Sequence, residues 1–270
     1  MKRWRASGRI AVFLLAALSA PTALAFGPFG HRVAGRIAEP FLCPAASAAV
    51  ERLGAGEALA ELGLWADRIR GNPRWESSAP WHYMNIDEGA QLDDYVSPPQ
   101  GDVLWAIAHF RARLANAAMG RETRAEALRF LTHFVVDLHQ PLHVGRQSDR
   151  GGNTITVSFG DERASLHRFW DTDAISGSDL PPERFVATLQ PLVRVLAASY
   201  RHADERGWAA ESLALRRAVY DFDAARGQLT DEYRMEAAEI LRLRLAQAGL
   251  RLAAEINAAL CPHRRASLGP

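Results

Sequence analysis

Residues 131–145, LTHFVVDLHQPLHVG, decide the fold expected for this chain. The stretch closes a longer run with apolar residues at helical spacing, and His133 and Asp137 stand four positions apart in it, so a helix places both on one face. Pro141 disfavours helix at the residue before it. The helix should therefore end there, and His143 should follow from the next turn.

Helical periodicity extends over most of the chain. Residues 151–160, GGNTITVSFG, are different, because their apolar residues alternate between glycines and predict a short strand or hairpin. Residues 71–100 contain four prolines and predict an irregular loop. The sequence thus predicts an all-α fold, a single compact helical domain with one short β-hairpin, and the arginine-rich helices after residue 182 are expected to present solvated faces. The segments with helical spacing are 56–70, 102–118, 121–139, 182–200, 208–225 and 230–258.

The first 25 residues have the form of a secretory signal. Four basic residues precede the apolar run IAVFLLAALSA, and ALA at 23–25 is a small-x-small cleavage site. An uncleaved anchor helix is the alternative, but the run is shorter than the about 18 apolar residues that span a bilayer. We expect cleavage after Ala25, a signal peptide over 1–25, a domain over 26–270, a secreted or periplasmic protein and no membrane association after cleavage.

The charge balance bears on the class of ligand. The formal net charge is +1, and four of the basic residues lie in the predicted signal, which leaves −3 for the domain. A chain without positive excess does not bind nucleic acid by bulk electrostatics. If the protein handles phosphates, the positive charge is expected to come from elsewhere, such as bound metal.

Cys43 and Cys261 are the two cysteines of the chain. In an exported protein an even number favours a disulfide, which here would tie an early helix end to the C-terminal region. Two separate buried thiols remain the alternative. The absence of a Cys-x-x-Cys motif argues against a thiolate zinc site.

Histidines and aspartates recur at spacings that suit a metal. His167 and Asp171, in SLHRFWD, repeat the separation of the first pair. Two further candidates stand close after a tryptophan: Asp67 in WADRIR and His82 in WHYMNI. One such pair alone is best explained as a surface contact. Several of them are explained together by a shared cluster of cations with nitrogen and oxygen ligands, which suits zinc.

The stretch ALAFGPFGH, residues 23–31, adds a further candidate. Cleavage after Ala25 frees the α-amine of Phe26, and this amine can chelate a metal together with the carbonyl of the same residue. Gly27 and Gly30 would let the chain fold back tightly, with His31 one turn further on. Taken alone, the stretch is better explained as a flexible start of the mature chain.

The ordered set FGPFGH, WADRIR, WHYMNI, THFVVDLHQPLH, GGN and LHRFWD resembles the S1/P1 family of secreted, zinc-dependent, single-strand-specific nucleases. The resemblance implies a helical fold of the zinc phospholipase C and zinc nuclease type with three Zn²⁺ ions. It implies that one zinc is held by Asp67, His82, His133 and Asp137. A second would be held by the amine and carbonyl of Phe26 with His31 and a bridging Asp137. The third would be held by His143, His167 and Asp171.

The resemblance also implies the chemistry. Arg70 matches a phosphate-contacting arginine, and Tyr83 and Asn85 match positions that stack on a base and hydrogen-bond to it. A hydroxide bridging two zinc ions would attack phosphorus in line, with Asp67, Arg70 and Asp137 as the catalytic set. The expected substrates are single-stranded DNA and RNA and 3′-nucleotides, the expected products are 5′-phosphates, and a monomer is expected.

Two departures from the family pattern stand out. Phe26 replaces the usual tryptophan at the start of the mature chain; because the expected ligand atoms are backbone atoms, chelation should survive. Ser165 replaces an asparagine found in many relatives, which puts one hydrogen bond around the cluster in question.

Two other functions compete with the nuclease. A zinc-dependent phospholipase C resembles this family in fold and cluster, but it usually carries glutamate at the position of Asp171, and the WHYMN stretch favours a base pocket. A non-catalytic zinc-binding protein is the second alternative, and Arg70 argues against it.

Overall fold

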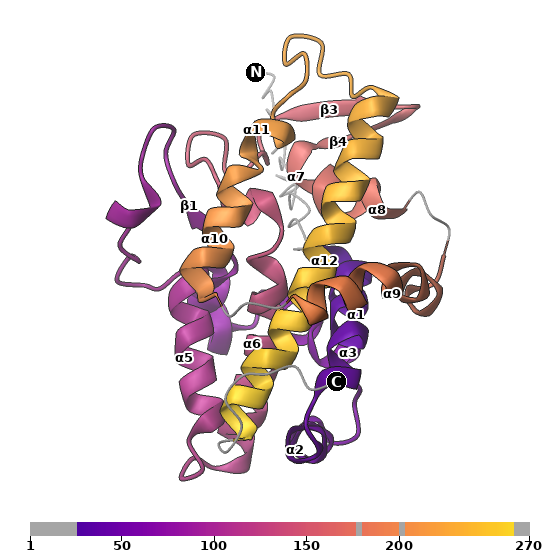
Figure 1. The fold of residues 1–270 in the computed structure, drawn as a ribbon. Helices are drawn as coiled ribbons and strands as arrows, with labels where there is room; N and C mark the ends of the chain where they lie inside the picture. The colour runs from indigo at the N-terminus through magenta and orange to yellow at the C-terminus, as the bar shows by residue number, and fades with distance from the viewer. Residues whose placement is uncertain (1–25, 177–179, 200–202, 262–270) are drawn as a thin grey trace, which may run out of the picture.

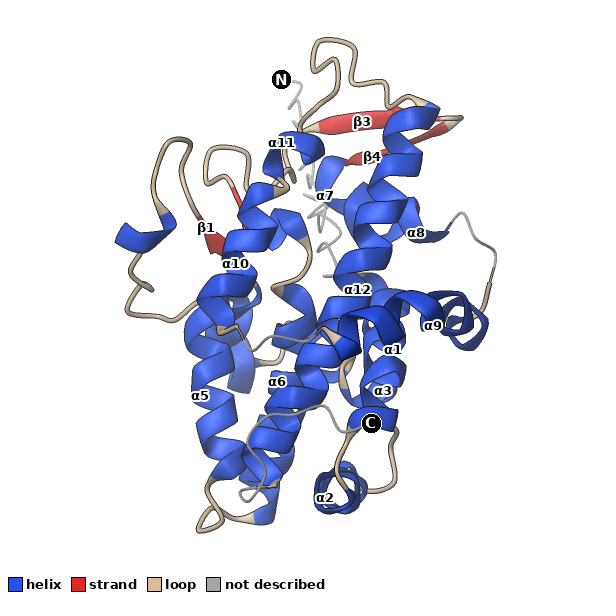
Figure 2. Ribbon diagram, in the orientation of Figure 1, coloured by secondary structure: helices blue, strands red, loops and turns tan. Residues whose placement is uncertain are grey.

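The computed structural model describes residues 26–176, 180–199 and 203–261. The predicted signal peptide lies outside these residues. The all-α prediction is confirmed, because helices make up most of the described chain and strands are few and short (Figure 2). The helices are α1 Gly27–Ala38, α2 Pro44–Gly54, α3 Leu59–Leu62, α4 Trp65–Arg68, α5 Val103–Ala115, α6 Arg121–Asp137, α7 Leu166–Arg168, α8 Ala174–Ser176, α9 Pro182–Ala198, α10 Glu205–Ala214, α11 Arg216–Val219 and α12 Asp231–Leu260.

The long helix α12 runs through the bundle and packs on α1, α5, α6 and α9 (Figure 1). It begins where the Thr230 hydroxyl accepts a hydrogen bond from the backbone N–H of Tyr233 at 3.2 Å, which satisfies an otherwise unpaired donor of the first turn. Between Arg244 and Ile256 nearly every residue is buried. A helix buried around most of its circumference is a core helix, and α12 therefore forms the axis on which the others are arranged.

Helices α5 and α6 lie side by side and are joined by aromatic packing. Phe110 stacks on Phe130 with ring centroids 4.5 Å apart, and Phe130 stacks on Phe134 at 5.3 Å. Helix α6 ends at Asp137, and the backbone is extended at Gln140, the residue directly before the turn Pro141–His143, as the proline predicts. The rigid aromatic packing thus fixes the end of α6 that carries Asp137.

The predicted hairpin is confirmed. Strand β3, Thr156–Phe159, pairs antiparallel with β4, Glu162–Ser165. A second pair was not expected from the sequence: β1, Met84–Asn85, lies parallel to β2, Val144–Gly145. This short pairing brings the residues after His82 alongside those after His143.

Two helix predictions need correction. Residues 56–70 form not one helix but α3 and α4, because the chain breaks at Gly63, whose carbonyl accepts a hydrogen bond from His133 Nδ1 at 2.7 Å. The prediction of a single helix over 208–225 is also wrong, because these residues fall in α10 and α11. α10 starts earlier, where the Asp204 carboxylate accepts a hydrogen bond from the backbone N–H of Gly207 at 2.9 Å, and α11 ends at Val219.

The expectation of solvated arginine-rich helices is wrong for α12. Arg244 and Arg251 are buried, and both donate to the carboxylate of Glu211, at 2.5 Å from Arg244 and at 2.6 Å to each oxygen from Arg251. Arg251 also donates to His139 Nε2 at 2.8 Å. We call His139, Glu211, Arg244 and Arg251 the arginine cluster. Buried arginines are stable here because a carboxylate and carbonyls compensate them.

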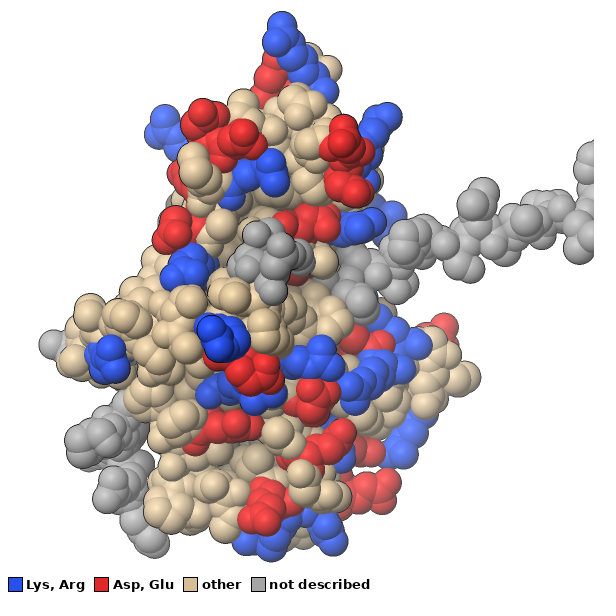
Figure 3. Space-filling view, turned by 90° about the vertical axis from the view of Figure 1, so that its right-hand side faces the viewer, with Lys and Arg blue, Asp and Glu red and all other residues tan. Residues whose placement is uncertain are grey.

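The disulfide between Cys43 and Cys261 is present and closes 218 residues of chain. It joins the residue before α2 to the residue after α12, as the sequence predicts. Within the described ranges, no helix combines the length and the apolar character needed to cross a lipid bilayer. On the face shown in Figure 3, basic and acidic side chains are interspersed rather than segregated.

Candidate metal centre

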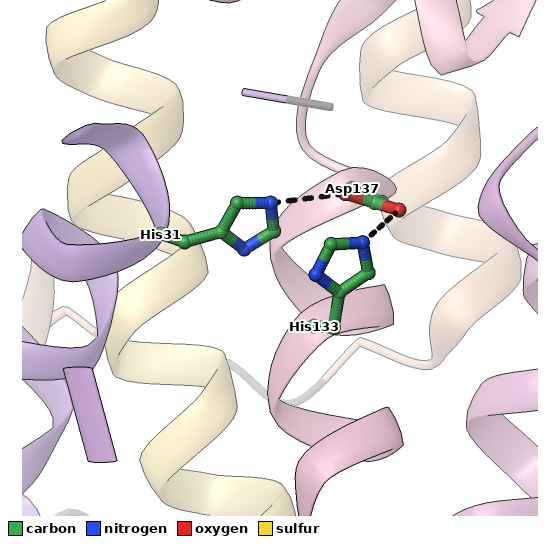
Figure 4. Close-up of side chains that lie close together, drawn as sticks. All are labelled: His31, His133 and Asp137. Carbon is green, nitrogen blue, oxygen red and sulfur yellow. Dashed lines mark ion pairs between the residues drawn. The ribbon is translucent and has the colours of Figure 1, made fainter. Parts of the chain in front are cut away.

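Asp137 stands at the middle of the cluster. Its Oδ1 lies 3.4 Å from His31 Nε2, and its Oδ2 lies 3.1 Å from His133 Nε2 and 3.0 Å from His82 Nδ1. All four side chains are buried. Figure 4 shows His31, from α1, and His133, from α6, both directed at this carboxylate. One carboxylate thus faces imidazoles from three separate elements.

Asp67 joins the group from α4. Its Oδ1 lies 3.8 Å from His133 Nε2 and 2.9 Å from Arg70 Nε. The ligand atoms of Asp67, His82 and His133 lie within 4.8 Å of one another, a spacing that one ion can bridge. The break at Gly63 allows α4 to begin in the direction that brings Asp67 here.

A further group lies beside the first. His167 Nε2 lies 3.2 Å from Asp171 Oδ2, and His143 Nε2 lies 3.8 Å from Asp171 Oδ1. The residues from Phe169 to Asp173 form one wide π turn after α7, a feature frequent at functional sites. His143 Nδ1 is 3.9 Å from Asp137 Oδ2, so the two groups adjoin.

The backbone fixes the orientation of three histidines. In each, Nδ1 lies 2.6–2.7 Å from a carbonyl oxygen and therefore carries the proton that it donates. The Nε2 lone pair is then free to point into the cluster, as in histidines that bind metals. The pairs are His133 with Gly63, His143 with His82, and His167 with Gly151.

The pKa shifts differ between members of the cluster. Burial lowers the pKa of His82 to about 4 and also lowers that of His143, which keeps both imidazoles neutral near pH 7. Burial alone would raise the pKa of Asp137, but His133, His143 and His31 together outweigh it and hold that pKa well below its usual value. Burial would lower the pKa of His133 and of His167, but the carboxylates that face them outweigh it and raise both, so a metal bound there would displace protons.

Several polar atoms of the cluster have no conventional hydrogen bond. Asp137 Oδ1, His143 Nε2 and Asp171 Oδ2 are buried and form none with any residue in the described ranges. A buried carboxylate oxygen without a donor costs free energy that a cation would offset. Nitrogen and oxygen donors in groups of three and four fit zinc, so the residues present fit this metal.

Phe26 reaches the cluster through its backbone. Its nitrogen donates to Asp171 Oδ1 at 3.2 Å, and its carbonyl accepts a hydrogen bond from Gly30 N at 3.1 Å. A Cβ at position 30 would lie 2.8 Å from the Phe26 ring, so only glycine allows this close approach. The atom that cleavage after Ala25 would convert to an α-amine thus lies beside the predicted ligand Asp171.

A cavity of about 840 Å³ opens over these groups. His82, His143 and His167 line it, together with Arg70, Tyr83 and Asn85, the three residues expected to contact substrate. Tyr83 is 42% exposed, and it shares with Asn85 one side of an extended segment, because alternate residues of a strand point the same way. The structure thus brings six of the predicted site residues to one cavity, and the other predicted ligands contact this set directly or through Asp137 and Asp171.

Gln140 contacts the cluster but was not predicted from the sequence. Its amide is buried, and Nε2 donates to Asp171 Oδ1 at 2.6 Å while Oε1 accepts a hydrogen bond from Leu142 N at 2.5 Å. The signal available was its place between Asp137 and His143, in a turn too short to reach solvent.

Ser165 stands where many relatives of the family have asparagine. It accepts a hydrogen bond from Arg168 N at 3.1 Å and so caps α7, the helix of His167.

Comparison with known proteins agrees with this geometry. The family model described as S1/P1 Nuclease matches residues 26–261. Endonuclease 2 of Arabidopsis thaliana is 32% identical over 92% of this chain and 94% of its own length. Nuclease P1 of Penicillium citrinum is 34% identical over 54% of this chain and 57% of its own, and nuclease S1 of Aspergillus oryzae is 29% identical over 55% and 54%.

Proposed function

The chain belongs to the S1/P1 nuclease family, and on that premise we propose that it is a zinc-dependent phosphodiesterase. It hydrolyses single-stranded DNA and RNA to 5′-phosphates and removes the 3′-phosphate of nucleotides. The observation that carries the proposal is the convergence of the histidine–aspartate groups on one cavity that also contains Arg70, Tyr83 and Asn85. The relatives named endonuclease and nuclease support the same reaction class.

In this proposal the chain holds three zinc ions. Zinc lowers the pKa of a bound water to about 7 and neutralises charge on phosphoryl oxygens, so it would supply the nucleophile and part of the charge stabilisation. The first ion would be held by Asp67, His82, His133 and Asp137. The second would be held by Phe26, His31 and Asp137. The third would be held by His143, His167 and Asp171.

The other residues orient and select the substrate. Arg70 faces the cavity while its Nε contacts Asp67, so a phosphate at the first group would meet a guanidinium held in place. Tyr83 offers an exposed ring for a base to stack on, and Asn85 offers an amide for the base edge. A base must leave its partner to stack in this way, which favours single strands over duplexes.

Export completes the site in this proposal. Cleavage after Ala25 would give Phe26 its amine and place the protein in the periplasm or outside the cell, where the Cys43–Cys261 disulfide is stable. The family match also begins at residue 26. N-terminal sequencing of the exported protein, with metal analysis, is expected to give a start at Phe26 and about three zinc ions per chain.

Hydrolysis assays test the function. The exported protein should cleave a single-stranded oligonucleotide at least about tenfold faster than the same sequence as a duplex, because stacking on Tyr83 requires an unpaired base. Cleavage of phosphatidylcholine without cleavage of the oligonucleotide would instead make it a phospholipase C. A chain that binds zinc and hydrolyses no phosphoester would be a non-catalytic metal-binding protein.

The substitution Tyr83→Ala tests the base site. It should raise KM for nucleotide substrates roughly tenfold with a smaller effect on kcat, because a stacked base contributes about 1–3 kcal/mol to binding. Tyr83→Phe is the matched control, since it keeps the ring and should keep KM. An unchanged KM in Tyr83→Ala would place the base elsewhere.

A further inference from the structure

The lining of the cavity has one sign of charge. Arg70, Arg150 and Arg168 are part of it, and no aspartate or glutamate is among its lining residues within the described chain. The chain as a whole is nearly neutral, and charges are interspersed on the face shown in Figure 3. The positive charge of the cavity is therefore a local property, and two of its three arginines have no part in the function proposed above.

Arg150 occupies an unfavourable backbone conformation. Its φ is +55°, and Gly151 and Gly152 follow with φ of +62° and +79°. Glycine is needed at 151, where a Cβ would lie 2.6 Å from the Leu142 carbonyl oxygen. At position 150 the backbone conformation itself disfavours arginine, because glycine or asparagine would adopt it with less strain. A strained residue that persists at a cavity points to a use for its side chain.

The Arg150 guanidinium is also available. It forms no ion pair and no hydrogen bond with any residue that the structure describes, and its residue is exposed. Arg168 is 58% exposed and contacts Asp173 only through Nε, at 3.6 Å. Both arginines can therefore turn toward a ligand in the cavity without giving up a strong internal contact.

Both arginines adjoin the His143–His167–Asp171 group. Arg168 follows His167 directly, and Arg150 precedes Gly151, whose carbonyl accepts from His167 Nδ1 at 2.7 Å. Arg70, by contrast, is bound to Asp67 of the neighbouring group. Positive side chains thus lie near two different groups of the cluster, so a ligand with more than one phosphate could meet both.

We propose that Arg150, together with Arg168, forms a second phosphate-binding subsite, which contacts a backbone phosphate next to the one being cleaved. The inference rests on the proposed nuclease function and deepens it, because the subsite would favour polynucleotides over substrates with a single phosphate. A planar guanidinium suits a phosphate, since two of its N–H groups can donate to two oxygens at once.

The test compares Arg150→Gln with Arg163→Gln, which removes an exposed arginine of β4 outside the cavity. The substrates are an oligothymidylate of eight nucleotides and bis(p-nitrophenyl) phosphate, which has one phosphate. Arg150→Gln should raise KM for the oligonucleotide roughly fivefold and leave KM for the small diester unchanged, since it removes one phosphate contact. The slope of log KM against log salt should fall by about 0.7. Arg163→Gln should change none of these.

Binding gives a readout that does not depend on catalysis. The Kd of a fluorescent phosphorothioate octamer, measured by anisotropy, should also rise about fivefold in Arg150→Gln. Arg150→Gly should weaken binding equally while Tm stays the same or increases, because glycine relieves the backbone strain. An unchanged Kd and KM in both variants would overturn the subsite. If the wild-type protein cleaves neither substrate, the nuclease proposal fails, and the binding measurement still decides the subsite.

Discussion

The metal centre and the arginine cluster are built from the same kind of buried histidine. His133 and His139 both place Nδ1 2.7 Å from a backbone carbonyl, of Gly63 and of Val135, and both direct Nε2 inward. They differ in what Nε2 meets. His133 Nε2 faces the carboxylate of Asp137 at 3.1 Å, whereas His139 Nε2 accepts a hydrogen bond from Arg251 at 2.8 Å.

The different partners of these two Nε2 atoms indicate which cluster needs a bound metal cation. The arginine cluster contains its own cations: Glu211 accepts from Arg244 and Arg251, and burial with these two arginines lowers the pKa of His139 well below its usual value, so it stays a neutral acceptor. The metal centre combines buried carboxylates with histidines, and the described part of the chain leaves some of their atoms without hydrogen bonds. The first cluster should be complete by itself, and the second should depend on metal.

The largest effect is expected from Asp137→Ala. Because this carboxylate faces His31, His82 and His133, its loss should remove two of about three zinc ions and lower kcat/KM by about 10³-fold or more. Metal analysis and oligonucleotide cleavage measure both. Asp171→Ala is the control and should lose about one zinc ion. Loss of a single zinc ion in Asp137→Ala would contradict the bridging role.

Arg251→Met should act on the other cluster alone. It leaves His139 Nε2 and Glu211 Oε1 without a donor, although Arg244 still donates to Glu211 Oε2. The free energy of unfolding should therefore fall by about 2–3 kcal/mol, while the zinc content stays at the wild-type level. Urea unfolding and metal analysis test the two parts. Arg163→Met, on an exposed residue, should leave the stability unchanged. Loss of zinc in Arg251→Met would show that the two clusters are not independent.

The smallest expected effect is a pH dependence of stability that comes from Glu211. Burial would raise the pKa of Glu211, but its bonds to Arg251 and Arg244 outweigh this and lower it below the ordinary value of 4.5. The ionised form therefore stabilises the fold above pH 4.5, and this contribution is lost as the pH falls through the lowered pKa. Glu211→Gln should thus be less stable than wild type at pH 7, by about 1 kcal/mol since the side chain is partly solvated.

The difference between Glu211→Gln and wild type should vanish as wild-type Glu211 protonates in acid. Urea unfolding in the presence of a chelator measures it without a contribution from metal release. A constant difference across this pH range would mean that Glu211 contributes packing rather than charge.

Much of this molecule can be predicted from its sequence, for identifiable reasons. Helical spacing is a local signal and gave α5, α6, α9 and α12 within a few residues. The ligand candidates were predictable because two of the pairs lie one helical turn apart, a spacing that already implies a common face. The hairpin was predictable from alternation between glycines.

The rest depends on contacts between distant residues. The break between α3 and α4 exists because the Gly63 carbonyl binds His133, 70 residues later in the chain. Arg251 is buried because Glu211 lies on another helix, and its own neighbours in sequence gave no sign of this. The pairing of β1 with β2 involves two residues on each side, too few for a pattern.

The position of the Phe26 nitrogen, 3.2 Å from Asp171, has a consequence for chemical labelling. The sequence contains a single lysine, Lys2, within the predicted signal peptide. A chain cut after Ala25 would therefore keep one primary amine, the α-amine of Phe26, and that amine would be among the proposed zinc ligands. An amine-reactive reagent should then leave the zinc-loaded protein unmodified and attach one label per chain after chelation. A single mass measurement would report both the cleavage and the state of the cluster.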